Sequence, residues 1–142
     1  MEAFGRVIAV LLTVSCMVFF SLFSKNVSMQ RQKSETVRSL VKEYVADLTE
    51  SRRISEERHE RFVKELASFG VYEIELTVYE RRRYEGEAGR VYLYSECKAT
   101  EGNKELLTGS YLRVTVAEQE KGKIETFLYG AACMIIAGGR VP

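Results

Sequence analysis

An uncharged apolar segment near the N-terminus constrains this chain more than any other feature. Residues 7–24 read VIAVLLTVSCMVFFSLFS and contain no charged side chain. About 18 apolar residues are enough for a helix to cross the hydrocarbon core of a bilayer. A core helix of a soluble domain would need a polar face, and this segment has none. The sequence therefore predicts a membrane anchor at residues 1–24, whose large apolar side chains are Val7, Ile8, Val10, Leu11, Leu12, Val14, Met17, Val18, Phe19, Phe20, Leu22 and Phe23.

The segment has two competing interpretations, a retained anchor and a cleaved signal peptide. A signal peptide has a positively charged start, an apolar region of roughly 7–15 residues and small residues before its cleavage site. The segment here is longer, and it ends in the sequence SLFSK, which has bulky residues where a cleavage site has small ones. Its length and its flanks favour a retained, single-pass anchor.

The charges that flank the anchor leave its orientation open. Arg6 precedes it, whereas Lys25, Arg31, Lys33 and Arg38 follow it. Lys and Arg accumulate on the cytoplasmic side of a membrane span, so a literal count places the following domain inside the cell. The positive residues are spread along a predicted helix rather than gathered at the boundary, which makes the count a weak guide.

Composition excludes several classes of function. The chain has 21 basic and 20 acidic residues and a net charge of +1, whereas binding to nucleic acid needs a basic surface. One histidine and three cysteines without metal-ligand spacing predict neither a metal nor a cofactor. Catalytic carboxylates need a cleft that separates their pKa values, and no pattern indicates one. We therefore predict a non-enzyme without a small-molecule substrate.

An amphipathic helix is predicted directly after the anchor. Residues 25–36 contain no glycine or proline, so one helix can leave the membrane and continue to Leu48, with its connection ending at residue 53. Apolar residues recur at helical spacing and form a single packing stripe. The stripe consists of Val37, Leu40, Val41, Tyr44, Val45 and Leu48.

A second helix is predicted at the start of a small domain that covers residues 54–142. Ser55 is a favoured N-cap, Ile54 is placed as a hydrophobic staple, and Gly70 is placed to end the helix. The spacing puts His59 on the solvated face. The predicted buried face consists of Phe62, Val63, Leu66 and Phe69.

After Gly70 the apolar period changes from 3.6 to 2, which is typical of strands with one buried face. We expect strands at 72–79, 91–99, 111–118 and 131–137, a charged loop at 80–90, and turns at 101–104 and 121–123. Residues 124–129 fit a strand or a short helix, and Gly138 and Gly139 are interpreted as turn residues. The predicted fold class is α+β, with a helix laid on about four antiparallel strands.

Two further features of the predicted sheet bear on function. Cys97 and Cys133 fall in predicted strands; a disulfide between them requires an oxidising compartment and Cα atoms within about 7 Å, and two buried thiols are the simpler interpretation. Seven tyrosines crowd the β region, where a half-exposed ring can anchor an interface or simply pack across strands. The basic run at 81–83 is offset by nearby glutamates.

The layout resembles type IV pilin-like proteins, and more specifically the small single-pass pilin-like proteins of Tad (Flp-type) pilus machinery in Gram-positive anaerobes. Three segments carry the resemblance: ISEERHERFVKELASFGVYEIEL (54–76), TGSYLRVTV (108–116) and IIAGGRVP (135–142). The resemblance implies a minor pilin or pseudopilin at the cell membrane, with its β domain outside. Precursors of this class have a glutamate five residues after the cleavage glycine, and here Gly5 is followed by Val10. An unprocessed assembly component in the membrane fits the same residues.

Two functions are therefore kept as hypotheses. The first is a membrane-anchored, pilin-like component of a pilus or secretion assembly, whose partners are membrane lipid and other assembly subunits. The alternative is a membrane-tethered, extracytoplasmic domain for ligand binding or sensing. A cavity of roughly 300 Å³ or more would favour the alternative, because ligand sites start at about that size.

Overall fold

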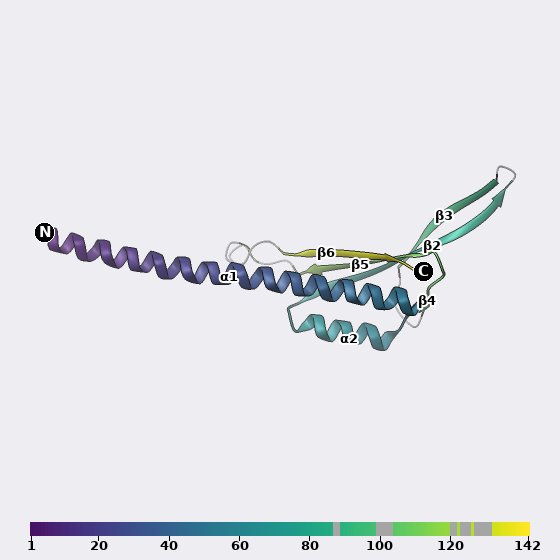
Figure 1. The fold of residues 1–142 in the computed structure, drawn as a ribbon, viewed down its shortest axis with the longest axis horizontal. Helices are drawn as coiled ribbons and strands as arrows, with labels where there is room; N and C mark the ends of the chain where they lie inside the picture. The colour runs from purple at the N-terminus through teal and green to yellow at the C-terminus, as the bar shows by residue number, and fades with distance from the viewer. Residues whose placement is uncertain (87–88, 99–103, 120–121, 123–125, 127–131) are drawn as a thin grey trace.

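A single continuous helix, α1 (Glu2–Ser51), carries both the apolar segment and the packing stripe (Figure 1). The computed structural model describes the backbone of residues 1–86, 89–98, 104–119, 122, 126 and 132–142, and the side chains of these residues except those between 82 and 98. At 1.5 Å per residue α1 is about 75 Å long. It ends at Arg52, whose left-handed φ of 54° turns the chain back. The predicted continuity of the helix is confirmed.

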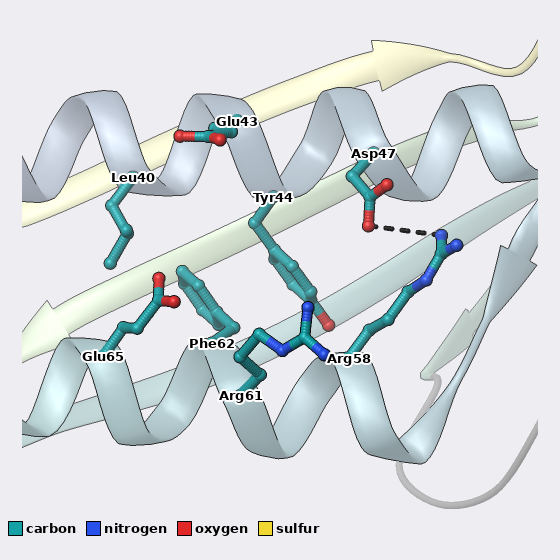
Figure 2. A pocket seen from close by; sticks show the side chains of 8 residues that line it. All are labelled: Leu40, Glu43, Tyr44, Asp47, Arg58, Arg61, Phe62 and Glu65. Carbon is teal, nitrogen blue, oxygen red and sulfur yellow. Dashed lines mark ion pairs between the residues drawn. The ribbon is translucent and has the colours of Figure 1, made fainter.

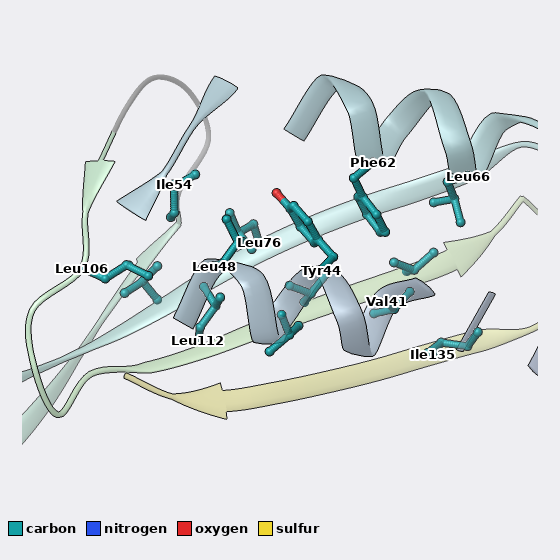
Figure 3. Packing of buried hydrophobic residues seen from close by; sticks show 14 of the residues in the cluster. Val41, Tyr44, Leu48, Ile54, Phe62, Leu66, Leu76, Leu106, Leu112 and Ile135 are labelled. Atoms are coloured by element: carbon teal, nitrogen blue, oxygen red, sulfur yellow. The ribbon is translucent and has the colours of Figure 1, made fainter. Parts of the chain in front are cut away.

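Helix α2 and two antiparallel sheets follow α1. Strands β2 (Tyr72–Gly86), β3 (Gly89–Lys98), β5 (Tyr111–Glu118) and β6 (Met134–Arg140) form a sheet in the order β3-β2-β5-β6. A second, unforeseen sheet pairs β1 (Arg53–Ile54) with β4 (Lys104–Glu105). Helix α2 (Glu56–Ala67) lies beside α1, and Figure 3 shows both helices in front of the larger sheet. The predicted α+β class is confirmed.

The hydrophobic core lies between α1, α2 and one face of the larger sheet (Figure 3). Five stripe residues of α1 are buried, and the sixth, Leu40, packs against the same cluster. Alternation along β5 sends Leu112, Val114 and Val116 inward, as predicted, because side chains of a strand point to alternate faces. Burial of these apolar side chains holds the C-terminal half of α1 on the sheet.

The region expected to be a charged loop at residues 80–90 is a β-hairpin instead. β2 continues to Gly86 and pairs with β3 residue by residue, from Thr77↔Lys98 to Gly86↔Gly89. Pairing with β5 stops at Tyr79↔Tyr111, so residues 80–86 and 89–95 form a two-stranded arm that projects past the end of α1 (Figure 1). Because no helix covers the arm, its strands do not need an apolar side chain at every second position. Its charged sequence therefore resembles that of a loop.

The last strand lies three residues further along than predicted, and Gly138 and Gly139 belong to it rather than to a turn. A Cβ added at Gly139 would lie 3.1 Å from Val45 Cγ1 and 3.1 Å from Thr49 Cγ2 of α1. The ring of Tyr111 covers the position where a Gly138 side chain would stand. These glycines are in the strand because α1 and Tyr111 come so close to it.

Helix α2 differs in detail from its sequence pattern. Ser55 is the N-cap, with extended backbone, and Phe62 and Leu66 are buried as predicted. Val63 is 38% exposed, since it lies about 100° around the helix from Phe62. The helix ends at Ala67, with Ser68 as C-cap, and Gly70 follows with a φ of 151°. The assignments made for residues 99, 101–103, 121, 123–125, 127–129 and 131 lie outside the described residues.

Candidate functional site

The first half of α1 makes no buried contact and is the most prominent candidate site. Every residue from 1 to 25 is exposed, and the first buried residue of the helix is Val37. All twelve apolar residues predicted for the anchor lie on this free part. Its length and composition are sufficient to cross a membrane. The structure thus separates α1 into a free apolar half and a half packed on the sheet.

An ion pair joins α1 to the sheet close to the point where the helix becomes free. Lys33 Nζ lies 3.1 Å from Glu118 Oε1, and the two side chains are 28% and 11% exposed. The second carboxylate oxygen of Glu118 accepts a hydrogen bond from the Cys133 backbone N–H at 3.2 Å. Glu118 therefore ties together α1, β5 and the residue before β6. We refer to Lys33, Glu118 and Cys133 as the helix–sheet clamp.

The surroundings of Lys33 in the clamp raise its pKa. Burial acts to lower the pKa of Lys33, but the hydrogen bond to Glu118 and the charges of Glu118 and Tyr72 outweigh it, and the pKa is raised. Burial is also the main reason that the pKa of Tyr72 is raised, against the opposing effect of Lys33. The Lys33 ammonium lies 5.7 Å from the centre of the neutral Tyr72 ring. Lys33 is thus a cation paired with one carboxylate.

A groove between α1 and α2 is the second candidate site (Figure 2). Tyr44 of α1 stacks on Phe62 of α2, with ring centres 4.1 Å apart and planes within 2°. The Tyr44 hydroxyl is 2.9 Å from His59 Nδ1, so His59 is half-buried and hydrogen-bonded to α1. The prediction that His59 lies on the solvated face of α2 is therefore wrong. Burial, with the charge of Asp47, raises the pKa of Tyr44 to about 12.

Charged side chains form the walls of this groove, and one ion pair joins two of them. Its volume is about 380 Å³. Arg58 Nη1 lies 3.2 Å from Asp47 Oδ2 across the groove (Figure 2), a pair that is 41% and 52% exposed and therefore contributes at most about 1 kcal/mol. The groove is lined by Leu40, Glu43, Tyr44, Asp47, Arg58, Arg61, Phe62 and Glu65. It exceeds the size set above for ligand binding, but it is open rather than enclosed.

A third hollow lies on the sheet face that the helices leave uncovered. It has a volume of about 390 Å³ and is lined by Tyr79, Gly109, Tyr111 and Arg140. The rings of Tyr79 and Tyr111 are 6.2 Å apart, and the Arg113 guanidinium lies 5.2 Å from the centre of Tyr79. This is ordinary cross-strand packing of aromatic side chains.

The described residues provide few ligands for a metal. No group of three or more His, Cys, Asp or Glu side chains is placed to hold a metal ion in the part of the chain that the structure describes. The one histidine already has Tyr44 as a partner on Nδ1. The groove lining includes no serine or cysteine. The groove lining consists of charged, aromatic and leucine side chains.

The two cysteines considered for a disulfide lie far apart along the sheet. Cys97 pairs with Val78, which pairs with Leu112 of β5, whereas the Cys133 carbonyl accepts a hydrogen bond from Glu118 N–H, six residues further along β5. Six residues span about 20 Å in a strand, well beyond the 7 Å limit. Cys133 has a free thiol 3.5 Å from Ser34 Oγ; the Cys97 side chain lies outside the described ones. A disulfide within one chain would need another register.

Comparison of the chain with protein-family models, with curated proteins and with solved structures found no match. The class of protein that the fold defines is therefore stated in structural terms. It is an α+β domain carried on a helix that is long and apolar enough to cross a membrane.

Sequence reasoning missed the contacts that join distant segments. His59 had a usable signal, because it precedes the buried Phe62 by three residues and Leu66 by seven, which puts all three on one helical face. The Lys33–Glu118 pair had none, since its residues are 85 positions apart.

Proposed function

We propose that this chain is a membrane-anchored, non-enzymatic, pilin-like subunit, a minor pilin or pseudopilin, of a Tad or other type IV-like pilus or secretion assembly. Its C-terminal domain stands outside the cytoplasm. The observation that carries the proposal is the division of α1 into a free apolar half and a half packed on the sheet.

The free half of α1 needs an apolar surrounding. Fully burying one large aliphatic or aromatic side chain stabilises by about 1.5–3 kcal/mol, and twelve such side chains are exposed here. A continuous apolar surface of this kind marks a membrane or protein interaction site. Lipid tails and the same helix of a neighbouring subunit both meet the requirement, which supports a protein that is stored in a membrane and packs into an assembly.

The anchoring and the side of the membrane are tested by thiol labelling in intact cells. Lys64 is exposed on α2, and a Lys64→Cys chain should react with a membrane-impermeant maleimide before lysis. The unsubstituted chain is the control for its own cysteines. Labelling of Lys64→Cys only after lysis would place the domain in the cytoplasm and overturn the proposal.

The assembly role is tested by photo-crosslinking from the anchor. A photoreactive amino acid in place of Leu12, which is 60% exposed, should capture another anchored subunit when the assembly machinery is present. Adducts with lipid alone would agree with a membrane-anchored protein and would contradict the pilin-like role.

The groove between α1 and α2 favours a second candidate, the membrane-tethered ligand-binding domain. Its volume of about 380 Å³ falls within the range of ligand sites. Native mass spectrometry of the full-length chain taken from its own membrane tests this. A small molecule bound by the wild type and absent from Leu40→Trp, which fills the groove, would favour ligand binding; an unliganded wild type would remove this candidate.

A further inference from the structure

In the part of the chain that the structure describes, the two outer strands of the larger sheet each have one neighbouring strand and an uncharged stretch. Among the described residues, β6 pairs only with β5 and β3 pairs only with β2. Met134 to Gly139 in β6 and Val91 to Ser95 in β3 contain no charge and no proline. Soluble proteins usually protect edge strands with charges, prolines or bulges, because an open edge pairs with other strands. The two stretches named here carry neither of the first two protections.

The hydrogen bonds of the sheet show which backbone groups are available at the β6 edge. Glu118 N–H donates to the Cys133 carbonyl (2.8 Å), and Val141 N–H donates to the Ser110 carbonyl (2.9 Å). Both pairs continue the β5–β6 register. Because bonded and non-bonded positions alternate along an antiparallel ladder, the odd-numbered residues of β6 bond to β5. The groups that point to the open edge belong to Met134, Ile136, Gly138 and Arg140.

The same alternation identifies the available groups of β3. The registers of the β5–β2 and β2–β3 pairs extend this alternation across the sheet. In β3, the backbone N–H and C=O groups of the odd-numbered residues therefore point toward β2. The backbone groups at the outer edge belong to Arg90, Tyr92, Tyr94, Glu96 and Lys98.

The arm formed by residues 80–86 and 89–95 has no third strand among the described residues. It extends beyond β5, so each of its strands has one neighbour (Figure 1). An isolated two-stranded hairpin is marginally stable in water, and a third strand is needed for stability. The β2 side of the arm reads ERRRYEG and is charged, whereas β3 offers VYLYS. A third strand would therefore join the arm on the β3 side.

The directions of the strands decide how two copies can meet. Three antiparallel pairings separate β3 from β6, so these strands run in opposite directions, and β6 runs in the same direction as α1 (Figure 1). An antiparallel β6–β6 pair would point the two anchors in opposite directions. When the anchors of two copies point the same way, β6 of one copy runs antiparallel to β3 of the other.

We infer that the β6 edge of one copy takes the β3 edge of another copy as its next strand, which joins copies head to tail into a continuous sheet. This rests on the proposed function, in which all copies enter one membrane in the same orientation. Such a heterologous contact leaves one edge open at each end and grows into a ring or a filament. The arm gains its third strand from the neighbour.

Proline substitutions at the two edges test this pairing. Ile136→Pro and Tyr94→Pro each remove an edge-facing N–H without removing a donor to β5 or β2. Ile136→Ala and Tyr94→Ala keep the N–H and are the matched controls. For the full-length chain in detergent micelles, sedimentation equilibrium should give oligomers for the wild type and both alanine variants and 16.2 kDa monomers for each proline variant.

Mixing the two proline variants gives the sharpest result. Each retains one working edge, so an equimolar mixture should form dimers of twice the monomer mass and nothing larger. A monomeric wild type would overturn the inference. Proline variants that assemble as the wild type does would also overturn it, and would leave the proposed function intact, because association would then come from the anchors.

Hydrogen exchange in the wild type provides a test that does not depend on variant folding. The edge-facing amides of Ile136 and Gly138 should exchange slowly at high protein concentration, at least tenfold slower than after dilution to monomer. Exchange that is equally fast at both concentrations would show an unpaired edge and overturn the inference.

Discussion

Replacing Leu48 with alanine tests whether burial of apolar side chains holds the C-terminal half of α1 to the sheet. Leu48 is fully buried in the last turns of α1, in the cluster that also contains Ile54 and Leu106 (Figure 3). The substitution removes side-chain carbons without changing charge or helix propensity appreciably. A loss of stability therefore reports on packing alone.

The size of the effect follows from the burial. Three carbon groups are removed at about 0.8 kcal/mol each, or about 2.4 kcal/mol. The cavity left behind adds to this, and Leu→Ala substitutions in well-packed cores cost about 2.7–5 kcal/mol. Because Leu48 has no exposed surface, we expect Leu48→Ala to lower the free energy of unfolding by about 3–5 kcal/mol.

Urea unfolding of the full-length chain in detergent micelles, followed by tyrosine fluorescence, measures this change. Leu11→Ala is the matched control, since it makes the same substitution in the same helix at a position that is 62% exposed. Its unfolding midpoint should match that of the wild type. A loss below about 1 kcal/mol for Leu48→Ala, or equal losses for both variants, would refute the claim that α1 is fixed to the sheet at this point.

Three further outcomes follow from particular contacts. Tyr44→Phe should lose about 1 kcal/mol of stability at pH 8, because its hydrogen bond to His59 is lost. Since the folded pKa of Tyr44 is raised to about 12, the wild type should lose about 2 kcal/mol as pH rises from 10 to 12, and the variant should not share this loss. Urea midpoints of the two chains that keep the same order at pH 12 as at pH 8 would contradict this. Glu118→Gln should lower the free energy of unfolding by about 1 kcal/mol, because the ion pair with Lys33 is lost. The difference in unfolding free energy between the variant and the wild type should become smaller in 1 M NaCl. A difference that does not change with salt would contradict a role for charge. Gly139→Ala should cost about 1–3 kcal/mol in thermal unfolding, because its Cβ would meet α1 at 3.1 Å. Gly5→Ala has open space and lies in a helix, so it should not lower the melting temperature. A Gly139→Ala chain that melts at the wild-type temperature would contradict the close approach of α1 to β6.

The local patterns of this sequence predicted its main elements correctly. The continuous α1, the stripe from Val37 to Leu48 and the alternation of β5 were each predicted from neighbouring residues. A period of 3.6 or 2 records which face of an element is buried, and the absence of glycine and proline keeps a helix intact. These signals are contained within a few turns or one strand, so they need no knowledge of the rest of the fold.

The tertiary structure alone decided the features that depend on what lies opposite. Residues 80–86 form a strand because β3 pairs with them, and Gly139 belongs to β6 because α1 lies against it. His59 is fixed by Tyr44, and Lys33 by Glu118. In each case the deciding contact joins separate elements, and its energy depends on distances that no local pattern contains. Sequence determined the two helices, the main strands and their apolar faces. Only the packing of these elements determined the arm, the small sheet and which described strands lie at an edge.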